Sequence, residues 1–198
     1  MGLGRQAKVL SKAQVSAVCS YLRGRRNGLR NETIFLLSCK AGLRAKEIAS
    51  LSWSMVLTPD GKVSKEISLT DSATKGKSGR VIPLHPDIRE NLGLLLENAG
   101  DTPGVSHSDR VITSERSNAV SSQTIVNMFQ SWYRELGLEG CSSHSGRRTF
   151  ITNTARLVST VGGSLRDVQM MAGHSSLQMT QRYIEADSQS QKRVVGLL

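Results

Sequence analysis

Four residues with chemically active side chains lie within the stretch 143–186. His144 and Arg147 are three positions apart, so on a helix they share a face and can point at one target. A guanidinium offers paired donors that match two oxygens of a phosphate. An imidazole such as that of His174 moves protons near neutral pH, and a phenol such as that of Tyr183 can attack as a nucleophile and stay covalently attached. Together these side chains predict chemistry on a phosphodiester.

Each of these motifs is common when it occurs alone. A single His-x-x-Arg is usually an exposed helix face, a Gly-His-Ser is usually a helix cap, and an exposed Tyr is usually a surface aromatic. Their order and spacing in one chain are much more specific. The combination resembles the tyrosine recombinases of the phage integrase family, whose signature runs His-x-x-Arg, then Gly-His, then Tyr. Here it is carried by residues 144–147, 172–176 and 180–183.

A second arginine lies in the segment 41–48, Ala-Gly-Leu-Arg-Ala-Lys-Glu-Ile. Taken alone, Arg44 followed by Glu47 one turn later predicts a surface ion pair that contributes little to stability. The segment also matches the family's first motif, Gly-Leu-Arg-x-x-Glu. The resemblance implies that Arg44 is the first of two phosphate-binding arginines and that Glu47 orients it.

The segment 73–80 is rich in glycine and basic residues and lies between two expected strands. Most such segments are hairpin tips with solvated charges. In the family, a hairpin of this kind carries a catalytic lysine, and Lys75 is the positional match, with Lys77 as the alternative. A lysine ammonium can donate a proton to a departing 5′ oxygen, which is otherwise a poor leaving group.

The resemblance implies a complete reaction. Tyr183 attacks a DNA phosphate and forms a 3′-phosphotyrosine, while the two arginines hold the non-bridging oxygens. His144 assists proton transfer, and His174 donates a hydrogen bond to the phosphate. One ester replaces another, so no metal or other cofactor is expected. The implied catalytic residues are Arg44, Lys75, His144, Arg147, His174 and Tyr183, supported by Glu47, and the implied further DNA-binding residues are Lys77, Arg80, Arg148 and Arg182.

Composition agrees with a polyanionic partner. The chain has 198 residues, 26 Lys and Arg against 16 Asp and Glu, and a net charge of +10, which favours binding to nucleic acid and does not specify a fold. Cys19, Cys39 and Cys141 lack the spacing of a zinc site and predict reduced thiols. No apolar run reaches membrane-spanning length. We expect a soluble protein of the cytoplasm, associated with the nucleoid.

Helical periodicity and capping signals predict a mainly helical chain. Ser11 and Gln14 form a capping box ahead of a helix, and Ser164 with Asp167 predicts another helix start. Pro86 suits the first turn of a helix. The expected helices span residues 11–22, 31–40, 45–51, 86–98, 122–136, 145–157 and 164–171.

Three short segments predict strands: 55–57, 67–69 and 81–84, the first two joined by the turn Thr58-Pro59-Asp60-Gly61. The expected fold is therefore α+β, mainly α-helical with a small three-stranded antiparallel sheet, as in the tyrosine recombinase catalytic fold. Residues 1–198 are expected to form one catalytic domain, with a short arm at 1–10 and a tail at 185–198.

The sequence departs from the family pattern in three ways. Arg148 stands where many members have His, which affects DNA contacts. Gly146 replaces the usual apolar residue, which predicts a looser helix start. The expected first helix begins near Ser11, which leaves no room for the N-terminal domain that closes around DNA in typical members. We expect either an excised catalytic domain or a naturally short member, like the fimbrial phase-switch recombinases.

Partners and alternative functions follow from the same resemblance. Double-stranded DNA is the expected substrate, with self-association on DNA and a tetramer at synapsis. The apolar tail is expected to dock on a neighbouring subunit when DNA is bound, or to fold back on its own chain. A type IB topoisomerase uses the same chemistry without a synaptic partner, and a non-cleaving DNA-binding regulator is the alternative from another class.

Overall fold

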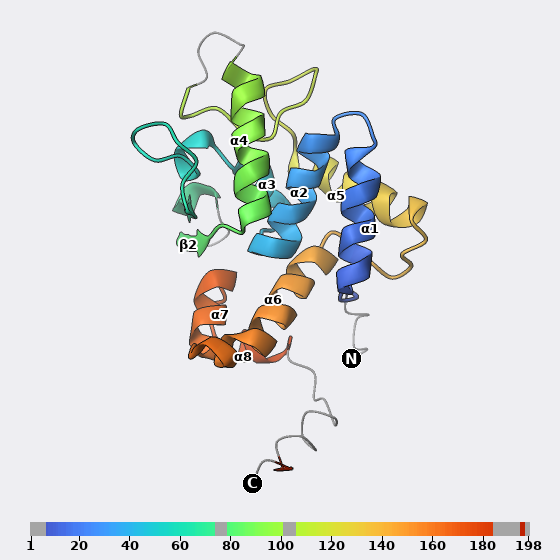
Figure 1. The fold of residues 1–198 in the computed structure, drawn as a ribbon, viewed down its shortest axis with the longest axis vertical. Helices are drawn as coiled ribbons and strands as arrows, with labels where there is room; N and C mark the ends of the chain where they lie inside the picture. The colour runs from blue at the N-terminus through green and yellow to red at the C-terminus, as the bar shows by residue number, and fades with distance from the viewer. Residues whose placement is uncertain (1–6, 74–78, 101–105, 184–194, 197–198) are drawn as a thin grey trace.

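The computed structural model describes residues 7–73, 79–100, 106–183 and 195–196. Helices dominate these residues, and one small sheet lies at the side of the helical body (Figure 1). In chain order the elements are α1 (Lys12–Arg23), α2 (Gly28–Ala41), α3 (Ala45–Ser50), η1 (Trp53–Met55), β1 (Glu66–Leu69), η2 (Asp71–Ala73), β2 (Arg80–Pro83), α4 (Pro86–Gly100), α5 (Ser122–Glu135), α6 (Ser145–Leu157), η3 (Val158–Val161), α7 (Leu165–Ala172) and α8 (Leu177–Gln181).

Helix α2 is the centre of the main hydrophobic core. Its residues from Asn31 to Cys39 are all buried, because α1, α4 and α6 pack around it. A helix that is covered on every side needs little amphipathic character, and α2 carries apolar residues around most of its circumference. It ends at Gly42, whose φ of +69° is the left-handed conformation that suits glycine at a helix C-terminus.

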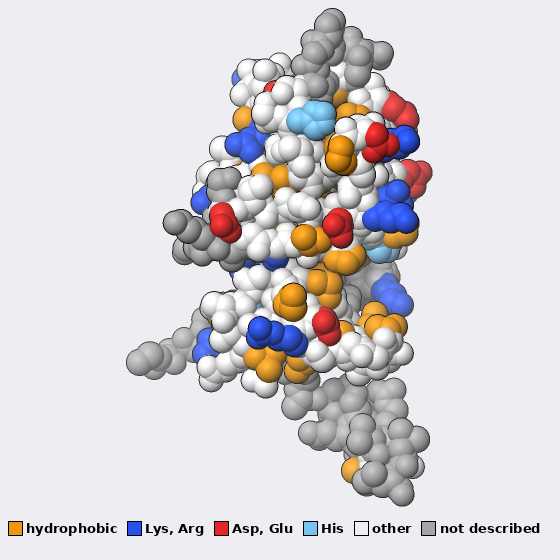
Figure 2. Space-filling view, turned by 90° about the vertical axis from the view of Figure 1, so that its left-hand side faces the viewer, with side chains coloured by type: hydrophobic (Ala, Val, Ile, Leu, Met, Phe, Trp, Pro, Cys, Tyr) orange, Lys and Arg blue, Asp and Glu red, His pale blue; other side chains and the backbone are white. Residues whose placement is uncertain are grey.

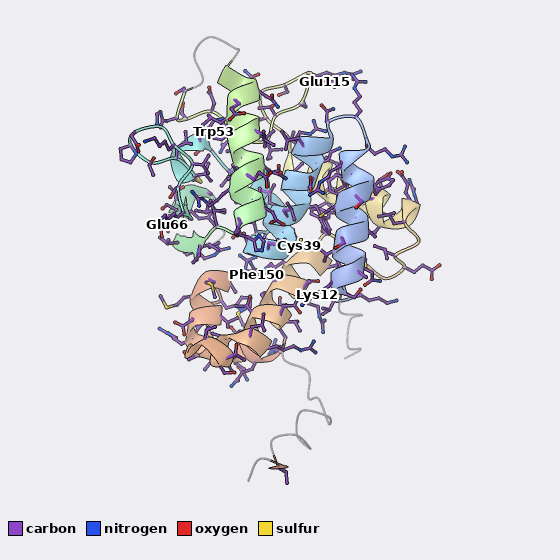
Figure 3. The ribbon with its side chains drawn as sticks, in the orientation of Figure 1. Lys12, Cys39, Trp53, Glu66, Glu115 and Phe150 are labelled. Atoms are coloured by element: carbon purple, nitrogen blue, oxygen red, sulfur yellow. The ribbon has the colours of Figure 1, made fainter. Side chains whose placement is uncertain are left out.

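A second, smaller cluster lies at the C-terminal end of the described chain. It joins Ile151 and Val158 to Val168 and Ala172, so it packs α6 against α7. Figure 1 shows α6, α7 and α8 grouped below the main body, with α6 running up to the end of α2. Cys39 of α2 and Phe150 of α6 lie at this junction (Figure 3). The junction brings the end of α2 close to the motif-bearing helices.

The sheet has two strands among the described residues, so the expectation of a third at 55–57 is wrong. Strands β1 and β2 pair antiparallel, with Ile67 opposite Ile82. The segment around Met55 instead forms a 3-10 helix, and the backbone N–H of Val56 donates to the carbonyl of Trp53. Met55 and Val56 are both buried although they are adjacent. A half-buried strand alternates its exposed and buried residues, which this segment does not do.

The capping signals place the helix starts correctly. Ser11 and Gln14 form the expected capping box of α1, and Ser164 and Asp167 form that of α7. Ser121 caps α5 by accepting a hydrogen bond from the backbone N–H of Thr124. Such caps depend on residues within one turn of each other, so they are visible in the sequence.

Gly146 does not loosen the start of α6. The residue is buried, and a Cβ added there would lie 2.5 Å from Ser38 Oγ and 2.9 Å from Ser38 Cβ. The glycine therefore lets α6 approach α2 more closely than any other residue would allow. This close approach carries Arg147, the next residue, to the end of α2.

We expect Gly146→Ala to destabilise the fold. The added methyl group would force α6 away from Ser38, and overpacking of this kind costs about 1–3 kcal/mol, which exceeds the gain of about 1 kcal/mol from the better helix propensity of Ala. Gly93→Ala in α4 is the matched control, since a Cβ there meets nothing within 4 Å. Urea denaturation of both variants checks this; a Gly146→Ala chain as stable as Gly93→Ala would contradict the close-approach role.

The surface shown in Figure 2 is mixed in charge. Basic, acidic and hydrophobic side chains are interspersed on this face, and neither sign of charge forms a large patch. The excess of basic residues is therefore not concentrated here. Within the described part of the chain, no helix is both long enough and apolar enough to cross a membrane.

Candidate active site

A cavity of about 440 Å³ brings together the residues that the sequence singled out. Its walls come from the segment before α3, the start of α6, the end of α7 and the residues after α8. Four arginines, two histidines and a tyrosine from segments distant in sequence thus share one space. The lining residues are Ala7, Arg44, Ser142, His144, Arg147, Arg148, His174, Met179, Arg182 and Tyr183.

Arg44 is held by Glu47 at the N-terminus of α3. Its Nη1 donates to Glu47 Oε1 at 2.8 Å, and its backbone N–H donates to Glu47 Oε2 at 2.9 Å. The Glu47 side chain is 1% exposed, whereas that of Arg44 is 31% exposed. Burial alone would raise the pKa of Glu47, but hydrogen bonds and charge from Arg80, with help from Arg44, lower it. Glu47 is thus an ionised, buried support for an arginine that still faces the cavity.

Arg147 links the end of α2 to the end of α7. Its Nη1 donates to the carbonyl of Gly42 and its Nη2 donates to the carbonyl of Ala172, both at 2.5 Å. Carbonyls at helix C-termini lack partners within the helix, so they are natural acceptors for a cation. Burial, and then the charge of Arg44, lowers the pKa of Arg147 to about 10. It stays charged at neutral pH with its position fixed by two bonds.

His174 follows Gly173, the left-handed residue that ends α7. Its Nδ1 lies 3.0 Å from Thr180 Oγ1 in a buried hydrogen bond. Its ring stacks on that of Tyr183, with centroids 5.3 Å apart and planes at 23°. Burial, and then the charges of Arg147 and Arg44, lowers the pKa of His174 to about 4. The imidazole is therefore neutral at pH 7, and Nε2 is the ring nitrogen not engaged by Thr180.

The pKa of His174 predicts a loss of stability in acid. Because the folded value of about 4 lies below the ordinary 6.5, the unfolded chain takes up this proton first as the pH falls from 6.5 to 4. The neutral His174 side chain makes its full contribution to the free energy of unfolding above pH 6.5, and that contribution is lost as the pH falls from 6.5 to 4. We expect wild type to lose roughly 2 kcal/mol more than His174→Gln between pH 7 and 4.5. Urea denaturation at both pH values measures this, and equal losses in the two chains would contradict it.

His144 and Tyr183 complete the wall of the cavity. His144 is the exposed N-cap residue of α6, one turn before Arg147. Tyr183 is half-buried, and its backbone carbonyl accepts a hydrogen bond from Thr152 Oγ1 at 3.2 Å. Tyr183 thus lies in the same cavity as both arginines of its own chain.

The remaining predicted residues have different positions. Arg182 is exposed and lines the cavity, and Arg148 lines it from a buried position. The side chain of Arg80, for which a DNA contact was predicted, is 6% exposed and pairs with Glu47. Lys75 and Lys77 lie outside the described residues.

Two features of the site have no local signal in the sequence. Thr180, the partner of His174, lies six residues after it, a separation that corresponds to no regular contact on one helix. The pairing of Arg80 with Glu47 spans 33 residues. A larger cavity of about 700 Å³ adjoins the site, shares Arg44 and His174 with it, and has Arg80 in its wall.

Comparison with known proteins identifies relatives of this chain. The model of the phage integrase family matches residues 8–190. The tyrosine recombinase XerD of Vibrio cholerae is 28% identical over 194 residues, which are 96% of this chain and 61% of the relative. The tyrosine recombinase XerC of Shewanella amazonensis is 28% identical over 167 residues, 84% of this chain and 52% of the relative. The chain thus spans about half to three-fifths of the length of these curated relatives.

Solved structures share the fold. The crystal structure of XerA recombinase superposes with a TM-score of 0.74 at 19% identity, covering 96% of this chain and 64% of that one. The XerH site-specific recombinase, solved bound to its difH substrate before cleavage, gives a TM-score of 0.71 at 18% identity, over 98% of this chain and 55% of that one. With its signature residues gathered in one cavity and the family model matched over nearly its whole length, the chain belongs to the phage integrase family.

Proposed function

We propose that this chain cuts and rejoins DNA as a site-specific tyrosine recombinase, through a 3′-phosphotyrosine intermediate. The observation that carries the proposal is the cavity in which Tyr183 lies with Arg44 and Arg147, whose guanidinium groups suit the oxygens of a phosphate. Both histidines of the signature line the same cavity. A nucleophile, several cations and two imidazoles in one space suit phosphoryl transfer and have no evident use in a protein that only binds.

The reaction conserves one phosphodiester bond. The phenol oxygen of Tyr183 attacks phosphorus, its proton passes to His144, and the bond from phosphorus to the 5′ oxygen breaks. The 5′ oxygen leaves as a hydroxyl after it takes a proton from Lys75, or from Lys77 if that residue is the acid. The 5′ hydroxyl of another strand then attacks the phosphotyrosine and restores Tyr183.

The arginines and His174 stabilise the transition state. Negative charge accumulates on the non-bridging oxygens during attack, and fixed donors aimed at that position lower the barrier. Arg147 is fixed by two carbonyls and Arg44 by Glu47, so neither needs to reorganise when DNA arrives. A neutral His174 can donate through Nε2 while Thr180 holds Nδ1.

The partner in this proposal is double-stranded DNA, held in addition by Lys77, Arg148 and Arg182. The XerH structure is of a recombinase bound to its DNA substrate, which supports the same partner here. Residues 1–198 act as one catalytic domain that assembles into a tetramer at synapsis. Most of the tail 185–198, with its expected docking, lies outside the described residues. The protein works in the cytoplasm, at the nucleoid.

A nicked suicide substrate tests this function. Cleavage beside the nick releases a short strand that cannot return, so the adduct accumulates and migrates slowly in a denaturing gel. We expect an adduct with wild type. DNA binding without an adduct would instead favour a non-cleaving regulator, and relaxation of supercoiled plasmids of any sequence would favour a type IB topoisomerase.

A further inference from the structure

Arg80 joins three elements that border the site. It is the first residue of β2, and its Nη1 and Nη2 donate to Glu47 Oε1 and Oε2 of α3, each at 3.0 Å. Its Nε donates to the carbonyl of Met171 in α7 at 2.8 Å. All three nitrogens of the guanidinium are therefore bonded within the protein, and the side chain is 6% exposed.

Glu47 is shared between two arginines. Each of its carboxylate oxygens accepts one bond from Arg80, while Oε1 also accepts from Arg44 Nη1 and Oε2 from the Arg44 backbone N–H. The fork-to-fork pair with Arg80 is the geometry in which a guanidinium and a carboxylate interact most strongly. The looser, partly exposed partner is Arg44.

The charges of this group of three determine what a phosphate would encounter. Two guanidinium groups and one carboxylate carry a net charge of +1. Without Arg80, the Glu47 carboxylate would cancel the charge of Arg44 at short range, in a buried setting where such cancellation is poorly screened. With Arg80 in place, Glu47 is already neutralised and the charge that remains belongs to Arg44, the member that faces the cavity.

The same side chain packs against the backbone that leads to His174. A Cβ at Gly173 would lie 2.9 Å from Arg80 Nη1 and 3.1 Å from Arg80 Cζ. The φ of +62° at Gly173 also requires a conformation that suits glycine. Arg80 therefore supports the end of α7 as well as Glu47.

We propose that Arg80 is a positioning residue: it neutralises and fixes Glu47, so that Arg44 presents an undiminished positive charge to the scissile phosphate. This inference rests on the proposed function, because it gives Arg80 a role in phosphoryl transfer. It replaces the DNA contact that the sequence predicted for Arg80. Arg80, the first residue of β2 after Lys75 and Lys77, thus supports the residues that would bind the phosphate.

The test is the rate of covalent adduct formation on saturating nicked substrate in single turnover. We compare wild type with Arg80→Met, Glu47→Gln and the double variant Arg80→Met/Glu47→Gln, which removes the carboxylate that Arg80 neutralises. We expect Arg80→Met to be slower than wild type by about 30-fold, which is less than the roughly 10²–10³-fold loss for a transition-state donor itself, because Arg80 acts through Glu47 and Arg44. The double variant should recover at least about tenfold relative to Arg80→Met.

The recovery separates this role from the alternatives. A side chain that contacts DNA gives no reason for a second substitution to restore the rate. A side chain that only holds the fold together could be rescued by Glu47→Gln, which removes the buried unpaired carboxylate; the rates are therefore compared between variants that thermal melting shows to be folded at the assay temperature. Arg89→Met in α4 is the matched control for net charge, since Arg89 is exposed and bonds the carbonyl of Ser64. We expect its rate to stay within about twofold of wild type.

Three results would overturn the proposal: Arg80→Met as fast as Arg89→Met, a double variant no faster than Arg80→Met, or no adduct with wild type. The last result alone would contradict the proposed function. If Arg80→Met is unfolded at the assay temperature, Arg80→Lys decides, because it keeps a positive charge beside Glu47. We then expect a folded chain slowed by less than about tenfold, and a larger defect would overturn the charge role.

Discussion

A Tyr183→Phe chain is expected to bind DNA as wild type does and to form no covalent adduct. The phenylalanine ring keeps the stacking on His174, and the hydrogen bond from Thr152 goes to the backbone carbonyl of residue 183, which the substitution does not alter. The fold and the cavity should therefore persist. Only the nucleophilic oxygen is lost, and loss of a nucleophile typically lowers the rate by about 10⁴-fold or more.

Tyr21→Phe is the matched control for this result. The Tyr21 hydroxyl, on α1, donates to Glu135 of α5, so the substitution removes one phenol oxygen without touching the cavity. We expect Tyr21→Phe to form the adduct at the wild-type rate on the same nicked substrate. We expect Tyr183→Phe to melt at the same temperature as wild type. An adduct formed by Tyr183→Phe at the wild-type rate would assign the attack to another residue.

Arg147→Ala is expected to impair both cleavage and stability. Loss of one fixed donor to the transition state lowers the rate by about 10²–10³-fold. The carbonyls of Gly42 and Ala172 also lose their donor, and a buried acceptor left without a partner costs about 1–3 kcal/mol. Arg147 thus differs from Tyr183, whose hydroxyl matters for the reaction alone.

Single-turnover cleavage and thermal melting, measured on the same preparations below the melting transition, separate the two losses. Arg156→Ala serves as the control, because Arg156 lies on the exposed face of the same helix. It should change the rate by less than about twofold, since an exposed surface charge has little effect. If Arg147→Ala were to melt early but cleave as fast as Arg156→Ala, Arg147 would be a structural residue only.

The residues of the candidate site could be predicted from the sequence because their motifs are short. His144 and Arg147 are one helical turn apart, Gly173 marks the end of α7 just before His174, and Arg44 with Glu47 occupies a single turn. The spacing of residues within each motif was enough to identify that motif. Only the order of the motifs along the chain indicated that they meet in the fold. The cavity brings five of the six catalytic candidates together.

The features that could not be predicted depend on contacts between distant segments. The ion pair of Arg80 with Glu47 is one of them, because the two residues are 33 positions apart. Gly146 looked like a loose helix start, whereas its environment is set by Ser38 of another helix. The apolar run at 55–57 suggested a strand, whereas Trp53–Met55 forms a 3-10 helix and the adjacent Met55 and Val56 both pack into the core. Tertiary packing decides each of these features, and no local pattern encodes it.

The most direct test identifies the atom that carries the DNA. After digestion of the adduct with trypsin and nuclease, mass spectrometry should find the nucleotide remnant on the peptide 183–192, attached to Tyr183 through a 3′ phosphate. The released strand should have a 5′ hydroxyl, which a ligase joins only after phosphorylation. A remnant on any other residue, or a 5′-phosphate linkage, would contradict the account.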